Sequence, residues 1–144
     1  AENIPILEQV EGSIRIKVVA GHYEGVDGVA KTLSPVLALQ ITLKAGQQTA
    51  IRVPESFNVM QYIVRGQLES SNGFAYESGI LLHYTKDGEV VLVKAAQDSE
   101  VLFLAGAPID EPIAQWGPYV MNSQTEILEA MRDYQMGKMG FYVD

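Results

Sequence analysis

Apolar and polar residues alternate in short segments over the first 106 positions of the chain. Residues 13–20 place Ile14, Ile16 and Val18 at every second position, and residues 36–44 place three leucines and one isoleucine in the same way. Further segments of this kind cover residues 59–65, 80–84, 90–94 and 101–105. A period of two sends successive side chains to opposite faces of an extended chain, so the pattern predicts β-strands with one apolar face.

Turn-forming residues separate these segments at short intervals. Asn72-Gly73 and Asp87-Gly88 are the strongest signals, because both dipeptides tolerate the positive φ of a tight hairpin. Short strands with a turn every eight to twelve residues or so are typical of an antiparallel sandwich or barrel. The pattern therefore predicts an all-β fold.

One helix is expected near the C-terminus. Ser123 and Glu126 have the spacing of a capping box, in which each side chain satisfies a backbone N–H group of the first helical turn. Ile127, Met131 and Tyr134 then follow at helical spacing, with Leu128 and Ala130 beside them, and Gly137 provides a stop. A lone helix cannot bury this apolar stripe, so we expect it to dock on the sheet or on another chain.

Composition narrows the class of protein. The chain has 144 residues, of which 47% are hydrophobic, and this length suits one compact domain. It contains no cysteine, which excludes disulfides, zinc–thiolate sites and cysteine nucleophiles. A formal charge of −8 with scattered basic residues argues against binding to nucleic acid. The sequence has neither an apolar run of about 18 residues nor a signal-like N-terminus, so we expect no membrane span and a cytoplasmic location.

The chain contains two histidines, His22 in a glycine-rich loop and His83 on an expected strand. A metal site in a β-barrel needs three or four converging ligands, usually histidine and carboxylate. The two histidines form no H-x-H pair and lie 61 positions apart. We therefore expect no metal site built by this chain alone, and we expect His83 to be a surface or a satisfied core histidine.

The segment between the last expected strand and the helix is stiff and rich in aromatic residues. Pro108 and Pro112 force the residues before them into extended conformations, which prevents a helix there. Asp110 and Glu111 are neighbours, and their side chains point to opposite sides of an extended chain, so we expect them to be solvated or to act as caps. Physical reasoning alone predicts a clasp over an open sheet or over a partner surface.

The same segment resembles the carboxyl-terminal signature of pirin-like proteins. The resemblance rests on residues 105–113, 117–123, 126–127 and 133–135, while residues 62–66 are similar to the Y-V-x-x-G strand end of cupins. The signature residues of this partner-facing arm are Gly106, Pro108, Asp110, Glu111, Pro112, Trp116, Gly117, Pro118, Tyr119, Met121 and Asn122. The resemblance implies a cupin-type antiparallel β-barrel, or jelly-roll-like sandwich, with one C-terminal α-helix.

Pirin-like proteins contain two cupin domains, and the resemblance implies that residues 1–144 form a single domain equivalent to the second, with its arm and helix at about 106–137. The iron ligands of the family, three histidines and one glutamate, belong to the first domain. Alignment of residues 62–66 on the cupin strand end places Arg52 and Pro54 where the H-x-H pair falls. Neither residue is a usable ligand, so we expect no cofactor here, and iron or another metal only where a first cupin is present.

A second cupin domain without the first leaves apolar surface exposed. We therefore expect a homodimer, or pairing with an N-terminal cupin domain. The barrel interior is expected to hold a small apolar molecule, with polar contacts from Asn58, Tyr62 or His83.

Three functions stay open at this point. The first is a metal-free module that is structural, mediates interactions or binds a small ligand, and that self-associates. The second, which complete family members suggest, is part of a metal-dependent quercetin 2,3-dioxygenase-type oxidoreductase whose metal lies in an N-terminal cupin. The third is a regulatory interaction domain that docks on another protein around Trp116 and Tyr119. The shortage of metal ligands favours the first, because the site rather than the fold decides function.

Overall fold

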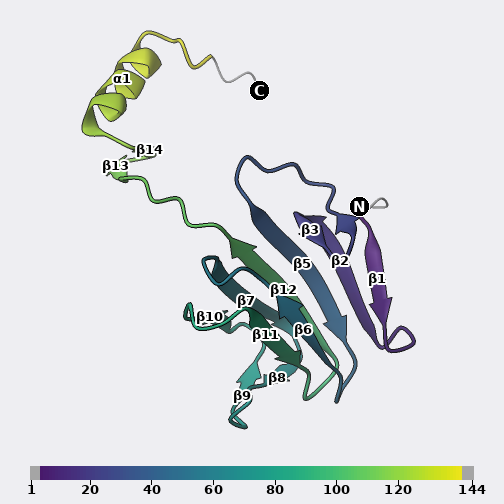
Figure 1. Ribbon diagram of the computed structural model, residues 1–144. Coiled ribbons are helices and arrows are strands. Elements are labelled where there is room, and N and C mark those ends of the chain that lie inside the picture. Colours follow the sequence, from purple (N-terminus) through teal and green to yellow (C-terminus); the bar gives the residue numbers. More distant parts are fainter. Residues whose placement is uncertain (1–3, 141–144) are drawn as a thin grey trace. The chain divides into compact units, whose positions relative to one another are not determined.

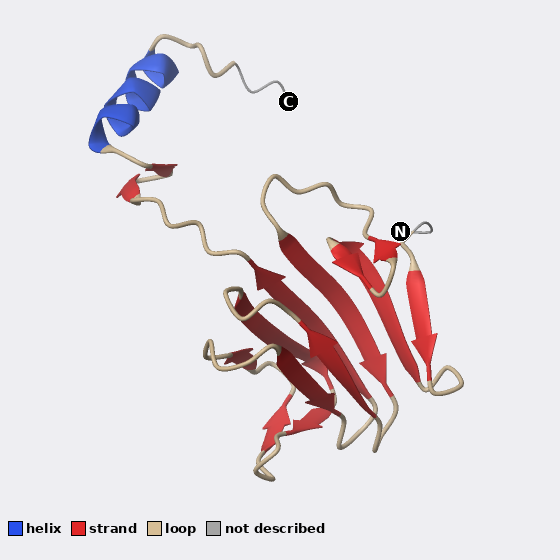
Figure 2. Cartoon of the chain, viewed as in Figure 1, coloured by secondary structure: helices blue, strands red, loops and turns tan. Residues whose placement is uncertain are grey.

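The computed structural model describes residues 4–140, and the chain divides into two compact units (Figure 1). Residues 1–108 are named the sandwich unit, and residues 109–144 are named the C-terminal unit. The sandwich unit is built from strands, whereas the C-terminal unit carries the helix (Figure 2). No helix within residues 4–140 is long and apolar enough to cross a bilayer.

A six-stranded antiparallel sheet is the larger layer of the sandwich unit. Its strands lie in the order β1-β2-β5-β12-β7-β10, so that strands far apart in the sequence are neighbours. Their bounds are β1 Ile6–Gln9, β2 Ile14–Ala20, β5 Val36–Leu43, β7 Asn58–Arg65, β10 Leu81–His83 and β12 Ser99–Gly106. The β12 strand pairs with β5 on one side and with β7 on the other.

Three two-stranded sheets complete the described part of the sandwich unit, and they pair β6 with β11, β8 with β9, and β3 with β4. The bounds are β3 His22–Tyr23, β4 Val26–Asp27, β6 Gln48–Arg52, β8 Gln67–Glu69, β9 Ala75–Glu77 and β11 Val90–Lys94. The edge strand β10 belongs to one sheet and the strand β11 to another. Within residues 4–108 the strands therefore form a sandwich rather than a closed barrel.

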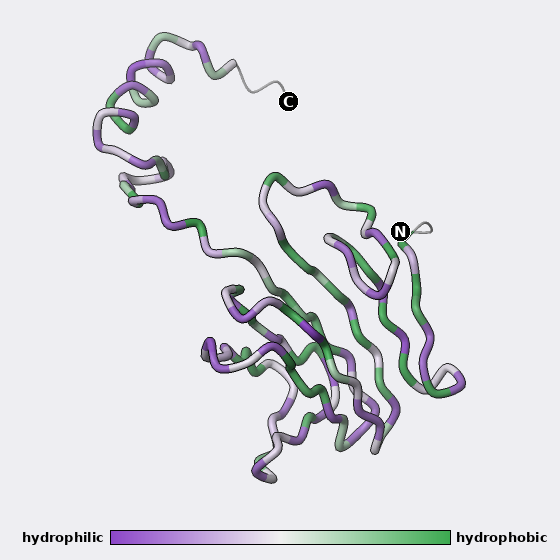
Figure 3. Tube along the Cα trace, in the orientation of Figure 1, coloured by the Kyte–Doolittle hydropathy of each residue, from purple (hydrophilic) through white to green (hydrophobic). Residues whose placement is uncertain are grey.

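Alternation along the strands decides which side chains form the core. On β12, Val101 and Phe103 are fully buried, and the residues between them lie on the opposite face. These side chains belong to one cluster with Ile51 of β6 and Val93 of β11, which joins the two layers. Figure 3 shows hydrophobic residues concentrated along the strands and hydrophilic residues mostly in the connecting loops.

The strands that the sequence pattern predicts are confirmed as β2, β5, β7, β10, β11 and β12. The pattern does not predict β1, β3, β4, β6, β8 and β9, most of which are shorter. The predicted all-β class with one C-terminal helix is confirmed. That residues 1–144 form a single domain stays a prediction.

The C-terminal unit begins with a hairpin in the segment that the sequence predicts to be a stiff crossing. Strand β13 (Ala114–Trp116) pairs with β14 (Tyr119–Met121), and Trp116 lies opposite Tyr119. Gly117 has a φ of +54°. A positive φ is required at the first position of a two-residue hairpin turn that begins with glycine, and Pro118 fixes φ at the second position. The Gly-Pro pair thus sets the turn of the hairpin.

The helix α1 (Gln124–Gln135) begins where the capping box predicts. The amide of Glu126 donates to Oγ of Ser123 at 3.3 Å, and Oε2 of Glu126 accepts from the amide of Asn122 at 3.1 Å. The helix packs on β13 and β14 through Ile127 and Ala130, which are buried. The predicted stripe is wrong at Tyr134, which is 65% exposed, because the packed face turns toward Ala130.

Candidate functional site

A cavity of about 550 Å³ lies where the edge strands β10 and β11 leave the sandwich open. We name it the seam cavity. Its apolar lining includes Leu68, Leu82 and Val91, and the aromatic side chains Tyr76 and Tyr84 contribute to the same surface. Small-molecule sites commonly have this volume and a mostly apolar lining with a few polar groups.

The most buried polar group of the seam cavity is Gln61, which comes from the inward face of β7 and is 1% exposed. Its Oε1 accepts a hydrogen bond from the Tyr84 hydroxyl at 2.5 Å. Burial, and then the charge of the nearby Tyr76, raises the pKa of Tyr84 to about 12. Tyr84 is therefore neutral around pH 7 and keeps the proton that it donates to Gln61.

The amide nitrogen of Gln61 is buried and has no hydrogen-bond partner among residues 4–140. A buried N–H group without a partner typically costs about 1–3 kcal/mol. The seam cavity thus combines an apolar lining with an unused donor.

The three residues predicted to contact a ligand in the interior all lie on the outer face of the sheet. Asn58 and Tyr62 alternate with the buried Val59 and Gln61, so they lie on the outer face of the sheet, and the prediction that they face the interior is corrected. His83 lies opposite Met60 in the register of β10 and β7, so its exposed side chain also belongs to the outer face, at the margin of the seam cavity. Ligand binding by any of the three stays a prediction.

Sequence reasoning missed Gln61, although a signal for it was present. Gln61 falls between Val59 and Ile63 in the alternating pattern of β7, at a position where an apolar side chain is expected. A polar residue in the buried phase of a strand needs a partner. The position of Gln61 in the alternating pattern of β7 therefore identifies it as the residue that faces the interior, whereas the polarity of Tyr62 does not.

The residues of this chain do not fit the iron site that the family resemblance implies. Nδ1 of His22, on β3, lies 2.7 Å from Oδ1 of Asp27 on β4, and His83 lies on β10. Arg52 ends β6, and Pro54 follows it. Residues 4–140 contain no group of three or more histidine, aspartate or glutamate side chains placed to hold a metal ion.

The signature residues of the arm make contacts within the C-terminal unit. Nδ2 of Asn122 donates to Oε2 of Glu111 at 2.9 Å and to the carbonyl of Pro112 at 3.0 Å. Glu111 and Asp110 are both exposed, in accordance with the prediction that they are solvated. These contacts tie the segment before the hairpin to the residue that precedes the helix cap, which gives the signature a structural role. Docking of the arm on a partner stays a prediction.

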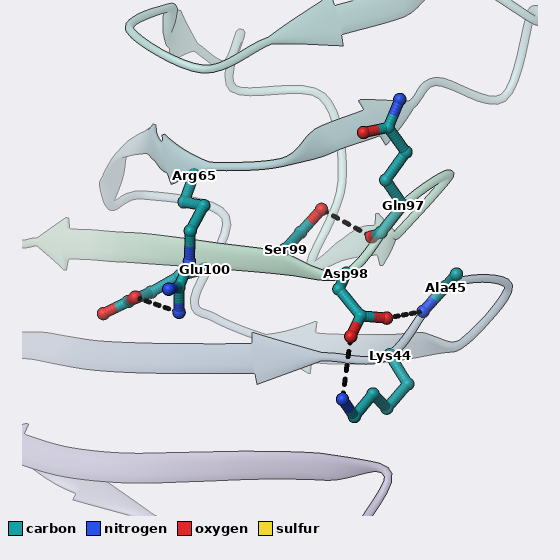
Figure 4. Close-up of polar contacts among 7 residues, drawn as sticks. All are labelled: Lys44, Ala45, Arg65, Gln97, Asp98, Ser99 and Glu100. Carbon is teal, nitrogen blue, oxygen red and sulfur yellow. Dashed lines mark hydrogen bonds and ion pairs between the residues drawn. The ribbon is translucent and has the colours of Figure 1, made fainter.

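A cluster of ion pairs lies at the end of the six-stranded sheet where β12 begins (Figure 4). Oδ2 of Asp98 accepts from Nζ of Lys44 at 2.7 Å, and Oδ1 of Asp98 accepts from the amide of Ala45 at 2.9 Å. Beside it, Arg65 of β7 donates to Glu100 of β12 at 2.9 Å. Asp98 thus joins the turn after β5 to the turn before β12.

Replacing Asp98 by asparagine should remove part of the pH dependence of stability. The hydrogen bond from Lys44, and then that from the amide of Ala45, lowers the pKa of Asp98 below its ordinary value of 3.8. A lowered pKa in the folded state gives stability that is complete above the unfolded pKa and is lost as the pH falls through the folded pKa. Urea unfolding should therefore show a deficit for Asp98→Asn at pH 7 that shrinks below about pH 4.

Asp87→Asn, in the exposed turn between β10 and β11, is the matched control for this substitution. It should track the parent protein more closely at every pH. A deficit for Asp98→Asn that is equal at pH 7 and pH 3 would contradict the assignment of the stabilisation to the ionised carboxylate.

The family described as the Pirin C-terminal cupin domain matches residues 38–140. This chain belongs to the pirin family. Pirin-1 of Arabidopsis thaliana is 39% identical over 137 residues, which cover 91% of this chain and 47% of that protein. This pirin chain spans about half the length of the curated relatives that it matches.

Solved structures agree with this assignment. Quercetin 2,3-dioxygenase from Acinetobacter baumannii matches this pirin chain with a TM-score of 0.89 and 31% identity, over 97% of this chain and 49% of that chain. The Escherichia coli pirin YhhW, solved in complex with nickel(II), shares the fold, with a TM-score of 0.55 and 21% identity over 65% of this chain and 40% of that chain. The predicted resemblance to pirins and the cupin-like sandwich are thereby confirmed.

Proposed function

We propose that this pirin domain is a metal-free structural and association module, which pairs with another cupin domain through the outer face of its six-stranded sheet. The observation that carries the proposal is an apolar centre on that face. Tyr62 and Met60 of β7 are 39% and 38% exposed, and Leu81 of β10 is 55% exposed. An exposed apolar centre of this kind is typical of an interaction surface.

Strand register makes these side chains one continuous surface. Tyr62 lies between Leu81 of β10 and Leu102 of β12, and Met60 lies beside Leu104 of β12. Residues directly opposite on one face of an antiparallel pair lie within contact distance of each other. The outer face is therefore defined by Met60, Tyr62, Leu81, Leu102 and Leu104.

A charged row borders the outer face on one side. Across neighbouring strands, Arg15 of β2 pairs with Glu8 of β1 at 3.3 Å, and Arg65 of β7 pairs with Glu100 of β12 at 2.9 Å. Protein interfaces commonly have an apolar centre and a polar rim. The charged row fits such a rim, because its ions are already paired and partly exposed.

The lengths of the relatives indicate the chemistry of the partner. The curated relatives are about twice as long as the part that this chain matches. The family resemblance implies that the other half is a cupin domain, and in a solution of this chain alone the partner that we propose is a second copy. Two copies that pair the same face form a closed two-fold dimer.

Tyr62→Lys should convert the dimer to a monomer. A lysine ammonium in the centre of the interface loses water without gaining a partner, so we expect the dissociation constant to rise roughly 30-fold or more, about 2 kcal/mol. Size-exclusion chromatography with light scattering, over a micromolar dilution series, measures this change. Lysine is chosen because it lowers the net negative charge of the chain, so a rise in the overall repulsion between two acidic copies cannot explain dissociation.

Phe74→Lys is the matched control, because Phe74 is an aromatic residue that is 65% exposed in the turn between β8 and β9. It should leave the dimer intact. A parent protein that is monomeric throughout the dilution series, or a dimer that both variants weaken equally, would remove the proposal.

A second function is favoured by one comparison. The Acinetobacter baumannii protein that matches with a TM-score of 0.89 is a quercetin 2,3-dioxygenase about twice the length of this chain. Under that alternative, this domain is the half of a metal-dependent oxidoreductase that carries no metal ligands. Stoichiometric iron, nickel or copper in the purified chain, lost in His83→Ala, would instead assign the metal to this domain and contradict the metal-free module.

A further inference from the structure

The seam cavity has features that the association module does not use. It lies among β8, β9, β10 and β11 and opens between two sheets, whereas the outer face belongs to the six-stranded sheet alone. Gln61 and Tyr62 are adjacent on β7 and point to opposite faces. Leu81 borders both surfaces, but Gln61 and Tyr62 each belong to one of them, so substitutions at these two neighbouring positions test the surfaces separately.

The geometry of the Gln61–Tyr84 pair shows that the described part of the cavity lacks a hydrogen-bond acceptor for the Gln61 amide. A primary amide has two N–H donors and one carbonyl acceptor. The Tyr84 hydroxyl donates to the carbonyl oxygen at 2.5 Å, and this bond turns the NH₂ group away from Tyr84. Within residues 4–140 no acceptor reaches that NH₂ group, whose nitrogen is buried. The pair thus offers donors and requires an acceptor.

The orientation of the amide does not remove this requirement. If Gln61 were turned so that its NH₂ group donated to the Tyr84 oxygen, one N–H would still be unused, since the group carries two. The carbonyl would also lose the hydroxyl that it now accepts from. The orientation with the hydroxyl on the carbonyl leaves both N–H donors on the side away from Tyr84, on a residue that lines the seam cavity.

The buried part of the lining is apolar, whereas its exposed part carries polar side chains such as Ser71, His83 and Thr85, so we expect a neutral ligand with an apolar body. Leu68 and Val91 are buried, and Leu82 is the cross-strand neighbour of Gln61 on β10. The cation at the margin, Lys94, is already paired with Glu69 at 3.0 Å. A charged ligand group beside Gln61 would lose water without gaining an opposite charge, whereas a neutral oxygen would gain the missing hydrogen bond.

We propose that the seam cavity binds a small neutral organic molecule with an aromatic or aliphatic body, whose carbonyl-type oxygen accepts from Nε2 of Gln61. Tyr84 acts as a positioning residue, because its hydroxyl fixes the amide. The aromatic rings of Tyr76 and Tyr84 provide flat surfaces for the body of the ligand. The cavity of about 550 Å³ is large enough for a molecule of one or two rings.

The test uses acetophenone as the neutral carbonyl probe, ethylbenzene as the same shape without the oxygen, and benzoate as the anion. The ¹H–¹⁵N spectrum of the full chain contains the side-chain NH₂ signals of Gln61, which are assigned by their loss in Gln61→Met. We expect acetophenone to shift these signals in a saturable way and to bind roughly tenfold more tightly than ethylbenzene or benzoate, as expected for one buried hydrogen bond.

Two variants test the site: Gln61→Met removes the hydrogen bond, and Leu82→Trp removes the space. In Gln61→Met the advantage of acetophenone over ethylbenzene should vanish, while the backbone spectrum stays folded. If Gln61→Met does not fold, Leu82→Trp is the second variant, and it should abolish binding of all the probes by filling the cavity. Tyr62→Lys, on the outer face, should bind acetophenone as the parent protein does, whether or not it dimerises.

Three results would overturn the proposal. The first is the absence of any shift of the Gln61 NH₂ signals at about 10 mM acetophenone, well above the dissociation constant of a useful fragment. The second is equal binding of acetophenone and ethylbenzene that Gln61→Met leaves unchanged, which would mean that water satisfies the amide. The third is benzoate binding as tightly as acetophenone, which would contradict the neutral ligand class.

Discussion

Phe103→Ala should reduce the free energy of unfolding by about 3–5 kcal/mol, the range observed when a buried aromatic side chain is cut back in a packed core. Phe103 is fully buried and comes from the inward face of β12. Its register partners are Leu39 on β5 and Gln61 on β7, so its loss opens space in the middle of the six-stranded sheet. Since single domains have only about 5–15 kcal/mol of stability, this variant should unfold at much lower urea concentration.

Phe74→Ala is the matched control, because it makes the same chemical change at a side chain that is 65% exposed. It should cost no more than about 0.5 kcal/mol, as is usual for surface substitutions. Equal losses for the two variants, measured by urea unfolding with unchanged m-values, would contradict the placement of Phe103 in the core that joins the two layers.

The long strands could be predicted from the sequence because burial repeats along them. On β5 every second side chain is buried over eight residues, which is long enough for the period of two to be recognised. The strands β3 and β4 have two residues each, and β8 and β9 have three, so no period can be read from them. Their pairing depends on turns and on neighbouring sheets, which single-sequence patterns do not encode.

The candidate functional residues on β7 show a different limit of prediction from sequence. The sequence predicts Tyr62 as a polar contact in the interior, but its position in the alternating pattern of β7 places it on the outer face. Gln61 has the buried phase and could have been found by that criterion. The seam cavity itself could not be predicted, because it depends on the edge strands β10 and β11 belonging to different sheets.

The ends of the helix in the C-terminal unit could be predicted from the sequence, but the packing of that helix could not. The cap at Ser123 and the stop near Gly137 follow from local backbone chemistry, and both lie where the sequence places them. The hairpin of β13 and β14 was missed because Pro108 and Pro112 indicated a continuous extended crossing. The helix buries Ala130 rather than Tyr134, since the hairpin is the surface on which it packs.

Gly66→Ala should be strongly destabilising at the junction between β7 and β12. Gly66 has a φ of +87°, and a Cβ atom there would lie 2.3 Å from the carbonyl oxygen of Asp98 and 2.7 Å from Cα of Ser99. Both contacts are with backbone, which cannot move aside as a flexible side chain can. The buried Ser99 hydroxyl also bonds to the amide of Gln67 at 3.0 Å, so a shift of either strand would break the link after Gly66.

Gly79→Ala separates the cost of the left-handed backbone from the cost of steric crowding. Gly79 has a φ of +86°, but nothing lies within 4 Å of its added Cβ atom. It should cost about 1–2 kcal/mol for the left-handed backbone alone. Gly66→Ala should cost about 1–3 kcal/mol more in urea unfolding, because steric crowding adds to the same backbone strain. Equal losses in the two alanine variants would mean that β7 and β12 do not approach each other closely at Gly66, and that the glycine of the cupin strand end serves only its own backbone conformation.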